Sequence, residues 1–505
     1  MITAQGKSLS DFERDAHAQL LASEQTQRRR RLTSVIAAAF AYWAIHGLAA
    51  ADPESDLFQP DVFGTGAALQ QRTPGLTDPF GRSCALPAEA LSLSSAIDLA
   101  LCRNPATRSA WAIAHQQAAA LGAAESAWLP DISATGSATR IFGTHQDENG
   151  ALTSDDQTTK DAAINLSWTL YDFGGRRGRI RSARYLLDAA AATASSVSQQ
   201  TVLNVVQAYY GVVAADAGLT AAQTTEATAA RSLDIARALR GGGVATLADV
   251  LQAETAYDQA VLTRIQAGQT AQATRGTLAV VMGSTADQPL KLAAEPVPAQ
   301  VPALTARMGD LMVEASRQRP DLAAARAQSE AAIADITVAR AAGRPSVSIT
   351  AGRNTINQTG IPTQSYGQVG INVSVPIFTG FSVGYNVRQA QAALQAREAN
   401  AEQIRLNVSL DVWNAYYSLD SASQQLATTA TLMTTAQNNQ DVALGRYQAG
   451  VGTIIDLLTA QTAAASARQL RISAELSWQV ARAQLALALG RLTGAEPLKG
   501  EGALP

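Results

Sequence analysis

Two acidic residues lie at corresponding places just after short glycine turns. Asp249 and Asp456 are 207 residues apart, and each follows its turn within a few positions. Several carboxylates gathered in one place attract cations. A single acid in the first turn of a helix instead stabilises that helix, because the helix dipole favours negative charge there. Both interpretations are open from the sequence. The turn glycines are Gly241, Gly242 and Gly243 in the first half and Gly450 and Gly452 in the second.

Residue types that support catalysis or metal binding are scarce. Of the four histidines, His17 and His46 lie in or before a predicted signal sequence, so only His115 and His145 would remain after it. No nucleophile–base motif, phosphate loop or metal-ligand spacing is present, and the run Gly241 to Gly243 follows a helical pattern rather than a strand. We therefore expect no enzyme activity, no cofactor and no metal centre.

The composition points to long helices rather than to a core of large apolar side chains. Only 5% of the 505 residues are aromatic and 16% are charged, while Ala, Gln, Ser and Thr run throughout. Small residues and good helix formers favour closely packed helices. The net charge of -3 offers no basic face, so no nucleic acid partner is expected.

The first 51 residues have the pattern of a leader with a secretory signal. Four arginines at 28–31 precede an apolar run at 32–48, and three alanines at 49–51 resemble a cleavage site. The run is shorter than the roughly 20 residues that span a bilayer, which disfavours the alternative of a membrane anchor. No other run of about 18 apolar residues exists, so a mature protein in a membrane would need a β-barrel.

The two cysteines, Cys84 and Cys102, are 18 positions apart. Exported proteins meet an oxidising compartment, so we expect a disulfide between them. A loop of that size would stabilise the fold by roughly 3 kcal/mol in the chain-entropy description. Two free buried thiols are the alternative.

Comparison of the chain with itself reveals two copies of one unit. The early matches are 215 residues apart and the later ones 207, so an eight-residue length difference falls between Pro130 and Ile164. A shared helical composition does not explain matched proline, tyrosine, glycine and aspartate positions. The matches include Pro105 with Pro320, Pro130 with Pro345, Tyr209 with Tyr416, Gly243 with Gly450, Asp249 with Asp456, and Gly283 with Gly490.

Each unit contains two stretches in which apolar and polar residues alternate, which predicts strands. The predicted strands cover about 131–142 and 160–171, then about 345–354 and 366–378, with polar loops at 143–160 and 354–365. Their length and their polar face suit a membrane barrel around a water-filled lumen. A half-buried hairpin in a soluble sheet is the alternative, but the export signal and the flanking long helices favour the membrane.

After each strand pair the pattern becomes helical for about 60–70 residues, or on the order of 100 Å. In the second unit an apolar position recurs about every 3.6 residues from Ile404 to Met433. So long a stripe must be buried along other helices, as in a coiled coil. The glycine turns end these helices, and Thr246 and Thr453 are expected to cap the helices that return.

The expected layout has six parts. They are a leader and signal at 1–51, an N-terminal segment at 52–88, a first repeat at 89–283, a proline-rich linker at 284–306, a second repeat at 307–492 and a C-terminal tail at 493–505.

In this order of elements the chain resembles the TolC-like outer-membrane factors, over about residues 90–492. The most specific segments are "LYDFGGRR" (170–177), "PIFTGF" (376–381), "GGGVATLADVLQAE" (241–254) and "YQAGVGTIIDLLTAQ" (447–461). The resemblance implies a mainly α-helical homotrimer in the cell outer membrane. Three chains of four strands would close a twelve-stranded barrel in the lipid, above a coiled-coil periplasmic tunnel. The helical hairpins would dock a periplasmic adaptor and an inner-membrane transporter.

The resemblance also implies an entrance gate, which this chain matches only in part. Tyr447 and Asp456 stand at matching positions, whereas Gly452 replaces an arginine and Thr459 replaces a second aspartate. The closing contacts and the block by cations are therefore expected to be weaker. We hypothesise a ring of three carboxylates from Asp456, and less directly from Asp249.

Three functions remain in competition. The first is the exit duct of a type I secretion system with an ABC-type transporter and an exported protein substrate, because the unlipidated ends and the cysteine pair resemble channels for adenylate cyclase toxin. The second is a duct for multidrug or metal efflux. The third is a structural coiled-coil protein of the envelope, which would form no pore.

Overall fold

The computed structural model describes residues 61–73, 84, 90–146, 150, 152–293 and 307–492. The chain divides into two units, 1–61 and 62–505, and the described helices and strands belong to the second. The predicted signal sequence, the tail and most of the linker lie outside the described residues.

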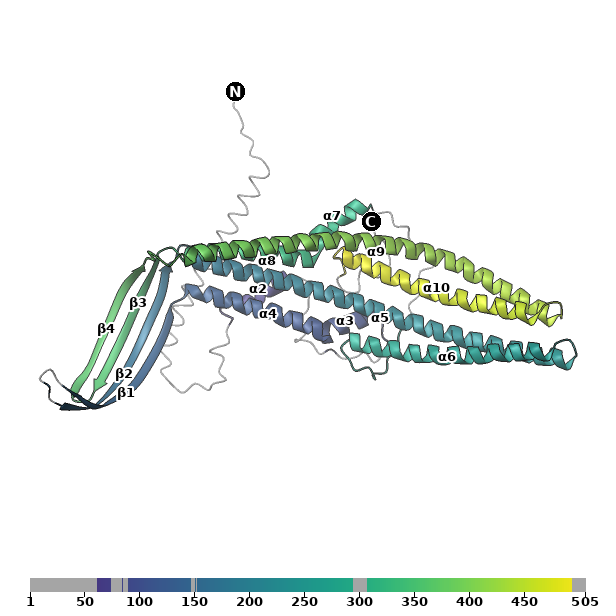
Figure 1. Cartoon of the computed structure of the whole chain (residues 1–505), viewed down its shortest axis with the longest axis horizontal. Coiled ribbons are helices and arrows are strands. Elements are labelled where there is room, and N and C mark those ends of the chain that lie inside the picture. Colours follow the sequence, from purple (N-terminus) through teal and green to yellow (C-terminus); the bar gives the residue numbers. More distant parts are fainter. Residues whose placement is uncertain are drawn as a thin grey trace, which may run out of the picture. The chain divides into compact units, whose positions relative to one another are not determined.

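The second unit is built from helices and one sheet (Figure 1). The first repeat contains α3 (Leu93–Arg103), α4 (Pro105–Glu125), the short 3-10 helix η2 (Ser126–Trp128), β1 (Asp131–Gln146), β2 (Leu152–Tyr171), α5 (Gly175–Gly241) and α6 (Leu247–Val281), after α2 (Thr65–Arg72). The second contains α7 (Met308–Gln318), α8 (Pro320–Ala341), β3 (Ser346–Gln358), β4 (Ile361–Ser374), α9 (Ser382–Gln448) and α10 (Ile454–Ala488).

The two repeats agree residue by residue in their long helices. Helices α5 and α9 have 67 residues each, α6 and α10 have 35 each, and both pairs are offset by 207. The eight-residue difference lies in the hairpins, since β1 and β2 have 16 and 20 residues whereas β3 and β4 have 13 and 14.

The four strands form one antiparallel sheet in the order β1-β2-β3-β4. Each predicted strand overlaps a strand of the structure. The prediction of a loop at 143–160 is wrong. Strand pairing continues through Gly143 opposite Asp155, because polar, threonine-rich segments pair through the backbone without an apolar periodicity. The loop expected at 354–365 is likewise wrong, since only Thr359 and Gly360 separate β3 from β4. Strand β4 ends at Ser374 and not at 378, shortly before Pro376, which cannot donate a ladder hydrogen bond.

The long helices bury narrow stripes of small residues against one another. Helix α5 packs along α4, α6, α8 and α10, and α9 packs along α8 and α10. Six residues of the stripe predicted on α9 are buried, namely Val408, Val412, Ala415, Leu419, Ala422 and Leu426. Part of α5 is long and apolar enough to cross a membrane by length and composition alone, which the sequence analysis did not anticipate. Within one chain, 33% of that stretch is buried, so its packing against neighbouring helices accounts for part of the apolar character.

A glycine closes the end of each repeat against the start of the same repeat. Gly283 has φ +77°, and a Cβ there would lie 2.7 Å from the carbonyl of Arg103. Gly490 has φ +76°, and its Cβ would lie 2.8 Å from the carbonyl oxygen of Gln318. Positive φ and a backbone at contact distance both exclude a side chain at these two positions.

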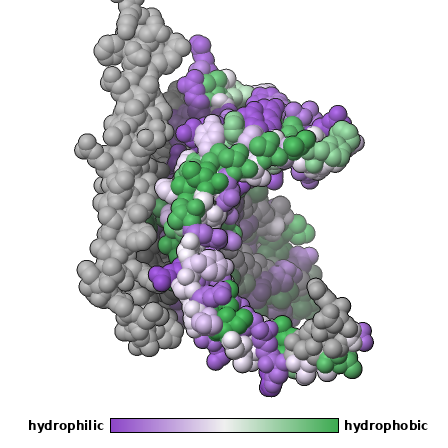
Figure 2. All heavy atoms as spheres, turned by 90° about the vertical axis from the view of Figure 1, so that its left-hand side faces the viewer, coloured by the Kyte–Doolittle hydropathy of each residue, from purple (hydrophilic) through white to green (hydrophobic). Residues whose placement is uncertain are grey.

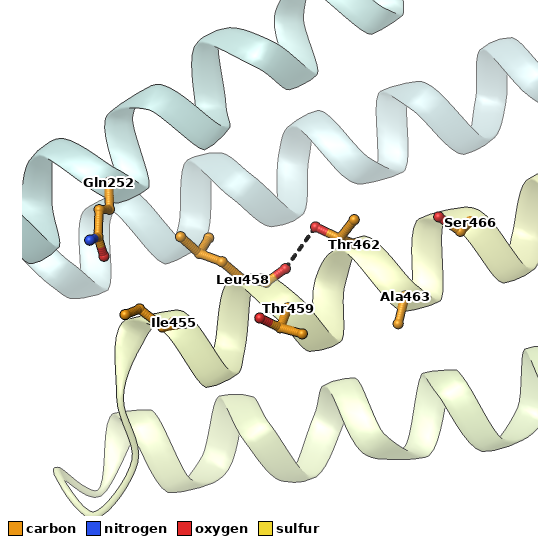
Figure 3. Close-up of a pocket in the computed structure, with 7 residues that line it drawn as sticks. All are labelled: Gln252, Ile455, Leu458, Thr459, Thr462, Ala463 and Ser466. Atoms are coloured by element: carbon orange, nitrogen blue, oxygen red, sulfur yellow. Dashed lines mark hydrogen bonds between the residues drawn. The ribbon is translucent and has the colours of Figure 1, made fainter.

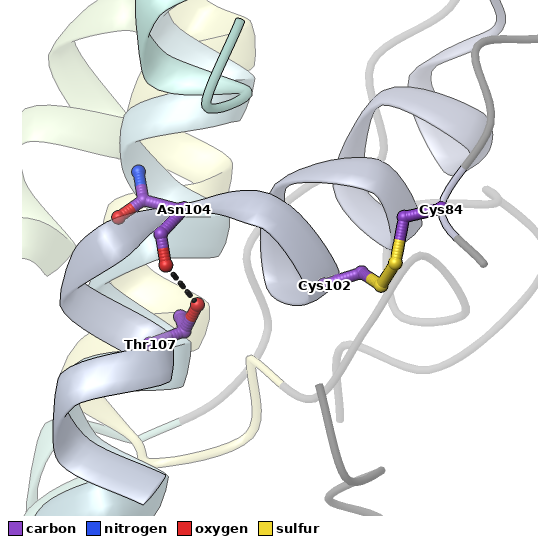
Figure 4. The surroundings of a disulfide bond; sticks show 4 residues. All are labelled: Cys84, Cys102, Asn104 and Thr107. Carbon is purple, nitrogen blue, oxygen red and sulfur yellow. Dashed lines mark hydrogen bonds between the residues drawn. A yellow bond between two sulfur atoms is a disulfide. The ribbon is translucent and has the colours of Figure 1, made fainter. Parts of the chain in front are cut away.

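Cys84 and Cys102 are joined in a disulfide with their Cα atoms 6.3 Å apart, within the ordinary range (Figure 4). Cys102 lies near the end of α3, and Cys84 packs against the core formed by α3, α5 and α6. The bond therefore attaches the segment before α3 to the helical body.

We predict that Gly283→Ala and Gly490→Ala each lower the free energy of unfolding by roughly 2–4 kcal/mol, from backbone strain and overpacking. Gly268→Ala is the matched control, because Gly268 lies inside α6 with no atom within 4 Å of an added Cβ. That change should be neutral or stabilising by up to about 1 kcal/mol. Denaturant unfolding in detergent, followed by far-UV circular dichroism, measures all three. Equal effects for the three variants would contradict the packing described.

Candidate functional site

The two glycine turns end α5 and α9 in the same way. Gly243 has φ +78° and Gly450 has φ +73°, the left-handed conformation that commonly follows a helix. The next residue donates back to the helix in each turn, Val244 to Leu239 at 2.9 Å and Val451 to Arg446 at 3.0 Å. A Cβ on Gly450 would lie 3.6 Å from Val244, so the two turns touch.

Asp249 and Asp456 each complete a capping box at the start of a returning helix. The Thr246 backbone N–H donates to Asp249 at 2.7 Å, and the Asp249 N–H donates to the Thr246 hydroxyl at 3.2 Å. Asp456 and Thr453 repeat the pair at 3.2 and 3.1 Å. The structure therefore gives both acids the role of first-turn stabilisers, which was the plainer of the two interpretations.

Hydrogen bonds from Thr453, with a smaller contribution from Arg446, lower the pKa of the Asp456 carboxyl. The group therefore stays ionised at neutral pH. Its contribution to the cap is present above the ordinary pKa and is lost as the pH falls through the lowered one. The Asp456 side chain is exposed, so its charge is presented to solvent at the end of the hairpin.

Tyr447 packs between the two helical hairpins. Its side chain is 4% exposed. Its hydroxyl has no hydrogen-bond partner among the described residues. Burial raises the pKa of Tyr447, and the negative charge of Asp249 adds to the rise. The structure thus brings Tyr447 of the second repeat close to Asp249 of the first. Its apolar neighbours are Leu233, Ala236, Val250, Ala253, Ile454 and Leu457.

Gly452 occupies a crowded place in its turn. An added Cβ would lie 3.1 Å from the Cβ of Arg446 and 3.2 Å from the backbone nitrogen of Tyr447. Its own N–H donates to the Arg446 carbonyl at 3.1 Å. A larger residue would require its neighbours to shift by a few tenths of an ångström.

One helical turn past the two acids, an open groove runs between α6 and α10 (Figure 3). Gln252 lines it from α6 and Thr459 from α10, so the two positions that follow the acids share one surface. The remaining lining residues are Ile455, Leu458, Thr462, Ala463 and Ser466. None of these side chains is charged.

The junction of β2 and α5 contains residues whose role the sequence analysis missed. Arg176 is 3% exposed, lies 4.2 Å from the centre of the Trp128 ring and donates to the Leu170 carbonyl at 2.8 Å. Asp172 accepts from the Arg176 backbone N–H at 2.6 Å, and Trp168 donates to the Trp128 carbonyl at 2.9 Å. The segment "LYDFGGRR" was a usable signal, but a buried arginine cannot be told from an exposed one by sequence.

The second repeat builds the same junction without charges. Gly343, Thr379 and Val383 stand where Trp128, Asp172 and Arg176 stand in the first repeat. A Cβ on Gly343 would lie 2.9 Å from Val383, so close apolar contact replaces the cation–π clamp.

A four-stranded sheet joined to two long helical hairpins is the fold of one class of outer-membrane channel, and comparison with known proteins places the chain in that class. Residues 96–284 and 311–491 match the outer membrane efflux protein family, to which the chain belongs. It is 32% identical over 463 residues to Protein CyaE of Bordetella pertussis, covering 90% of this chain and 93% of CyaE. It is 24% identical to the outer membrane protein TolC of Salmonella enteritidis, covering 73% and 76%.

The solved structure of the outer-membrane channel OprN has the same fold, with a TM-score of 0.70 at 23% identity, covering 82% of this chain and 95% of OprN. The chain is therefore an outer-membrane channel with a helical periplasmic tunnel, and it is not an enzyme. Channels of this class are trimers that work with an adaptor and an inner-membrane transporter.

We predict that Tyr447→Phe leaves the free energy of unfolding unchanged or raises it by up to about 1 kcal/mol, because it removes a buried hydroxyl without a partner. Tyr447→Ala, which empties the contact between the hairpins, should instead cost roughly 3–5 kcal/mol. Denaturant unfolding in detergent tests both. A loss above about 1 kcal/mol for Tyr447→Phe would show that the hydroxyl is bonded in the assembled protein.

Proposed function

We propose that the chain is the exit duct of a type I secretion system for a protein such as a toxin. The observation that carries this is its likeness to CyaE, which extends over nearly the full length of both chains, whereas the likeness to TolC is weaker and shorter. The cysteine pair and the overall run of the sequence resemble the same branch of the family. A duct for multidrug or metal efflux is the second candidate, favoured by the family match.

The duct is proposed to be a homotrimer with a twelve-stranded barrel. Four strands are too few to enclose a water-filled lumen. In the protomer, β1 and β4 each have one unpaired edge. Exposed edges are costly unless they pair, and pairing β4 of one copy with β1 of the next satisfies both.

The tips of the two helical hairpins are proposed to bind the periplasmic adaptor, which links the duct to an ABC-type transporter. Both tips expose large apolar side chains around Gly241, Gly242, Gly243, Gly450 and Gly452, which supports a docking surface. The exposed residues are Val244 at 64%, Leu247 and Leu251 at 52%, Val451 at 69% and Ile455 at 61%.

The entrance gate is proposed to use Asp456, Asp249 and Tyr447. Three copies of the exposed Asp456 would place three carboxylates around the opening, and such rings favour cations. Tyr447 and the touching turns would hold the two hairpins together. Because Gly452 and the uncharged groove supply no arginine and no second acid, closure would depend on these contacts.

We predict that Asp456→Asn lowers the cation selectivity of single channels in planar bilayers and weakens block by a multivalent cation. Thr453→Ala is the matched control, because it removes the cap and keeps the carboxylate. It should cost about 0.5–2 kcal/mol of stability and leave the selectivity as it was. If the selectivity and the block are unchanged in Asp456→Asn, Asp456 only caps its helix and takes no part in a ring of charge.

The proposed cargo is tested by deleting the gene and restoring it on a plasmid. We expect the deletion to remove a specific protein from the culture medium, without a matching rise in drug or metal sensitivity. The double variant Leu247→Ser and Val451→Ser should fail to restore secretion yet conduct normally in bilayers, since both side chains are exposed and neither change alters the charge at the entrance. Restored secretion by that variant would argue against the docking surface, and a defect confined to drug or metal resistance would favour efflux.

A further inference from the structure

The strands carry three lysine or arginine residues, one on each of β1, β2 and β3. Strand pairing places Arg140 opposite Thr158, Lys160 opposite Ala138 and Asn357, and Arg353 opposite Ile164 and Gly367. Residues directly opposite one another lie on one face of a sheet, and so do residues two apart along a strand. All three cations are therefore on the same face.

That face is the apolar one. It carries Ile132, Ala134, Ile164, Leu166, Trp168, Ile349, Ala351, Val369, Ile371 and Val373. The other face carries Ser133, Thr135, Thr139, Asn165, Ser348, Thr350, Gln368 and Asn372. It also holds the acid Asp161, which accepts from Ser137 at 3.3 Å. Figure 2 looks onto this end of the molecule, where apolar side chains reach the surface.

In a barrel with a water-filled lumen, the apolar face meets lipid. A cation at the middle of the bilayer would then cost roughly 2–4 kcal/mol, against about 0–1 kcal/mol near the head groups. The position of the three cations along the strands therefore matters.

They lie in the outer, loop-side half of their strands. Arg140 is nine residues from the helix-side end of β1, and Lys160 is eleven from that of β2. Because Arg140 pairs with Thr158, thirteen residues from the helix-side end of β2, the two heights can be counted from that one end. At a rise of about 3.3 Å per residue and a tilt of about 40°, Arg140 and Lys160 are then about 33 and 28 Å above the base. The apolar band of such barrels is about 25 Å tall. Arg353, about 18 Å up, is within reach of the same level because arginine extends its charge toward the interface.

Aromatic pairs lie at the opposite, helix-side end of the strands, as expected at the inner membrane boundary. The rings of Tyr171 and Phe173 are 4.8 Å apart, and those of Phe378 and Phe381 are 5.4 Å apart. The apolar rows are thus bounded by aromatic side chains on one side and by cations on the other.

We infer that Lys160 and Arg353, assisted by Arg140, bind the phosphate groups of lipid head groups in the outer leaflet of the membrane. The inference rests on the barrel proposed above. Lys160 and Arg353 are exposed and have no ion pair with any described residue. Arg140 is held by Asp156 through two bonds of 2.8 and 2.9 Å, so it contributes less. An ammonium and a planar guanidinium are the groups that recognise phosphate.

The test uses the purified full-length trimer, a chelator to remove divalent cations, and native mass spectrometry with bisphosphorylated lipid A. The wild-type protein should retain this lipid and bind its dephosphorylated form much less. Lys160→Gln and Arg353→Gln should each weaken binding about fivefold, and together about 25-fold, at roughly 1 kcal/mol per cation. Arg353→Lys should recover most of the single loss.

Asp161→Asn is the control on the polar face, and it should leave lipid binding unchanged while altering conductance. Equal binding by the wild type and the Lys160→Gln, Arg353→Gln double variant, or no preference for the phosphorylated lipid, would overturn the inference. Normal conductance of the double variant would show that the barrel is intact. If the wild-type protein also shows no conductance, the proposed barrel itself would be contradicted.

Discussion

The structure depends on the burial of a narrow apolar stripe along helices of 67 residues. Such a helix is on the order of 100 Å long and has no compact core to pack against. Its stripe can be buried only by other helices that run beside it. In this chain, different shorter helices bury different parts of each stripe. Helices α4 and α8 cover the halves nearer the sheet, and α6 and α10 cover the halves nearer the turns (Figure 1). Alanine dominates these contacts because it lets the helix backbones approach closely.

This arrangement explains why the repeat is strict in some places and loose in others. The turns, the caps and the closing glycines agree at a constant offset, since a shift of one residue would rotate a helix by about 100° and expose its stripe. The hairpins can differ in length because added strand residues extend past the membrane without changing the packing below. The two strand–helix junctions also differ, with a buried arginine on a tryptophan in one repeat and a glycine against a valine in the other.

The acids beside the turns show how one residue can serve two purposes. The hydrogen bonds to Thr453 stabilise the helix and also keep the carboxylate of Asp456 ionised. The exposed cap therefore presents a fixed charge at the end of the second hairpin. In a trimer three such charges would converge, so the role in folding and the proposed role in conduction are compatible. Asp249 differs in lying near the buried Tyr447, which links the charge of the first hairpin to the contact between the two.

The sequence by itself determined the elements that depend on local chemistry and period. Prolines begin and end helices through their geometry, glycines end them through positive φ, and alternation marks strands. The doubled pattern then predicted the order of elements and the location of the turns. Only the tertiary structure decided what depends on distant contacts. It extended the strands through polar segments, because backbone pairing supplies the hydrogen bonds there. It buried Arg176 against Trp128, placed Tyr447 beside Asp249, and put three cations on the apolar face of the sheet. Each of these arrangements brings together residues from different helices or strands. A local sequence pattern does not indicate how such distant elements pack against one another.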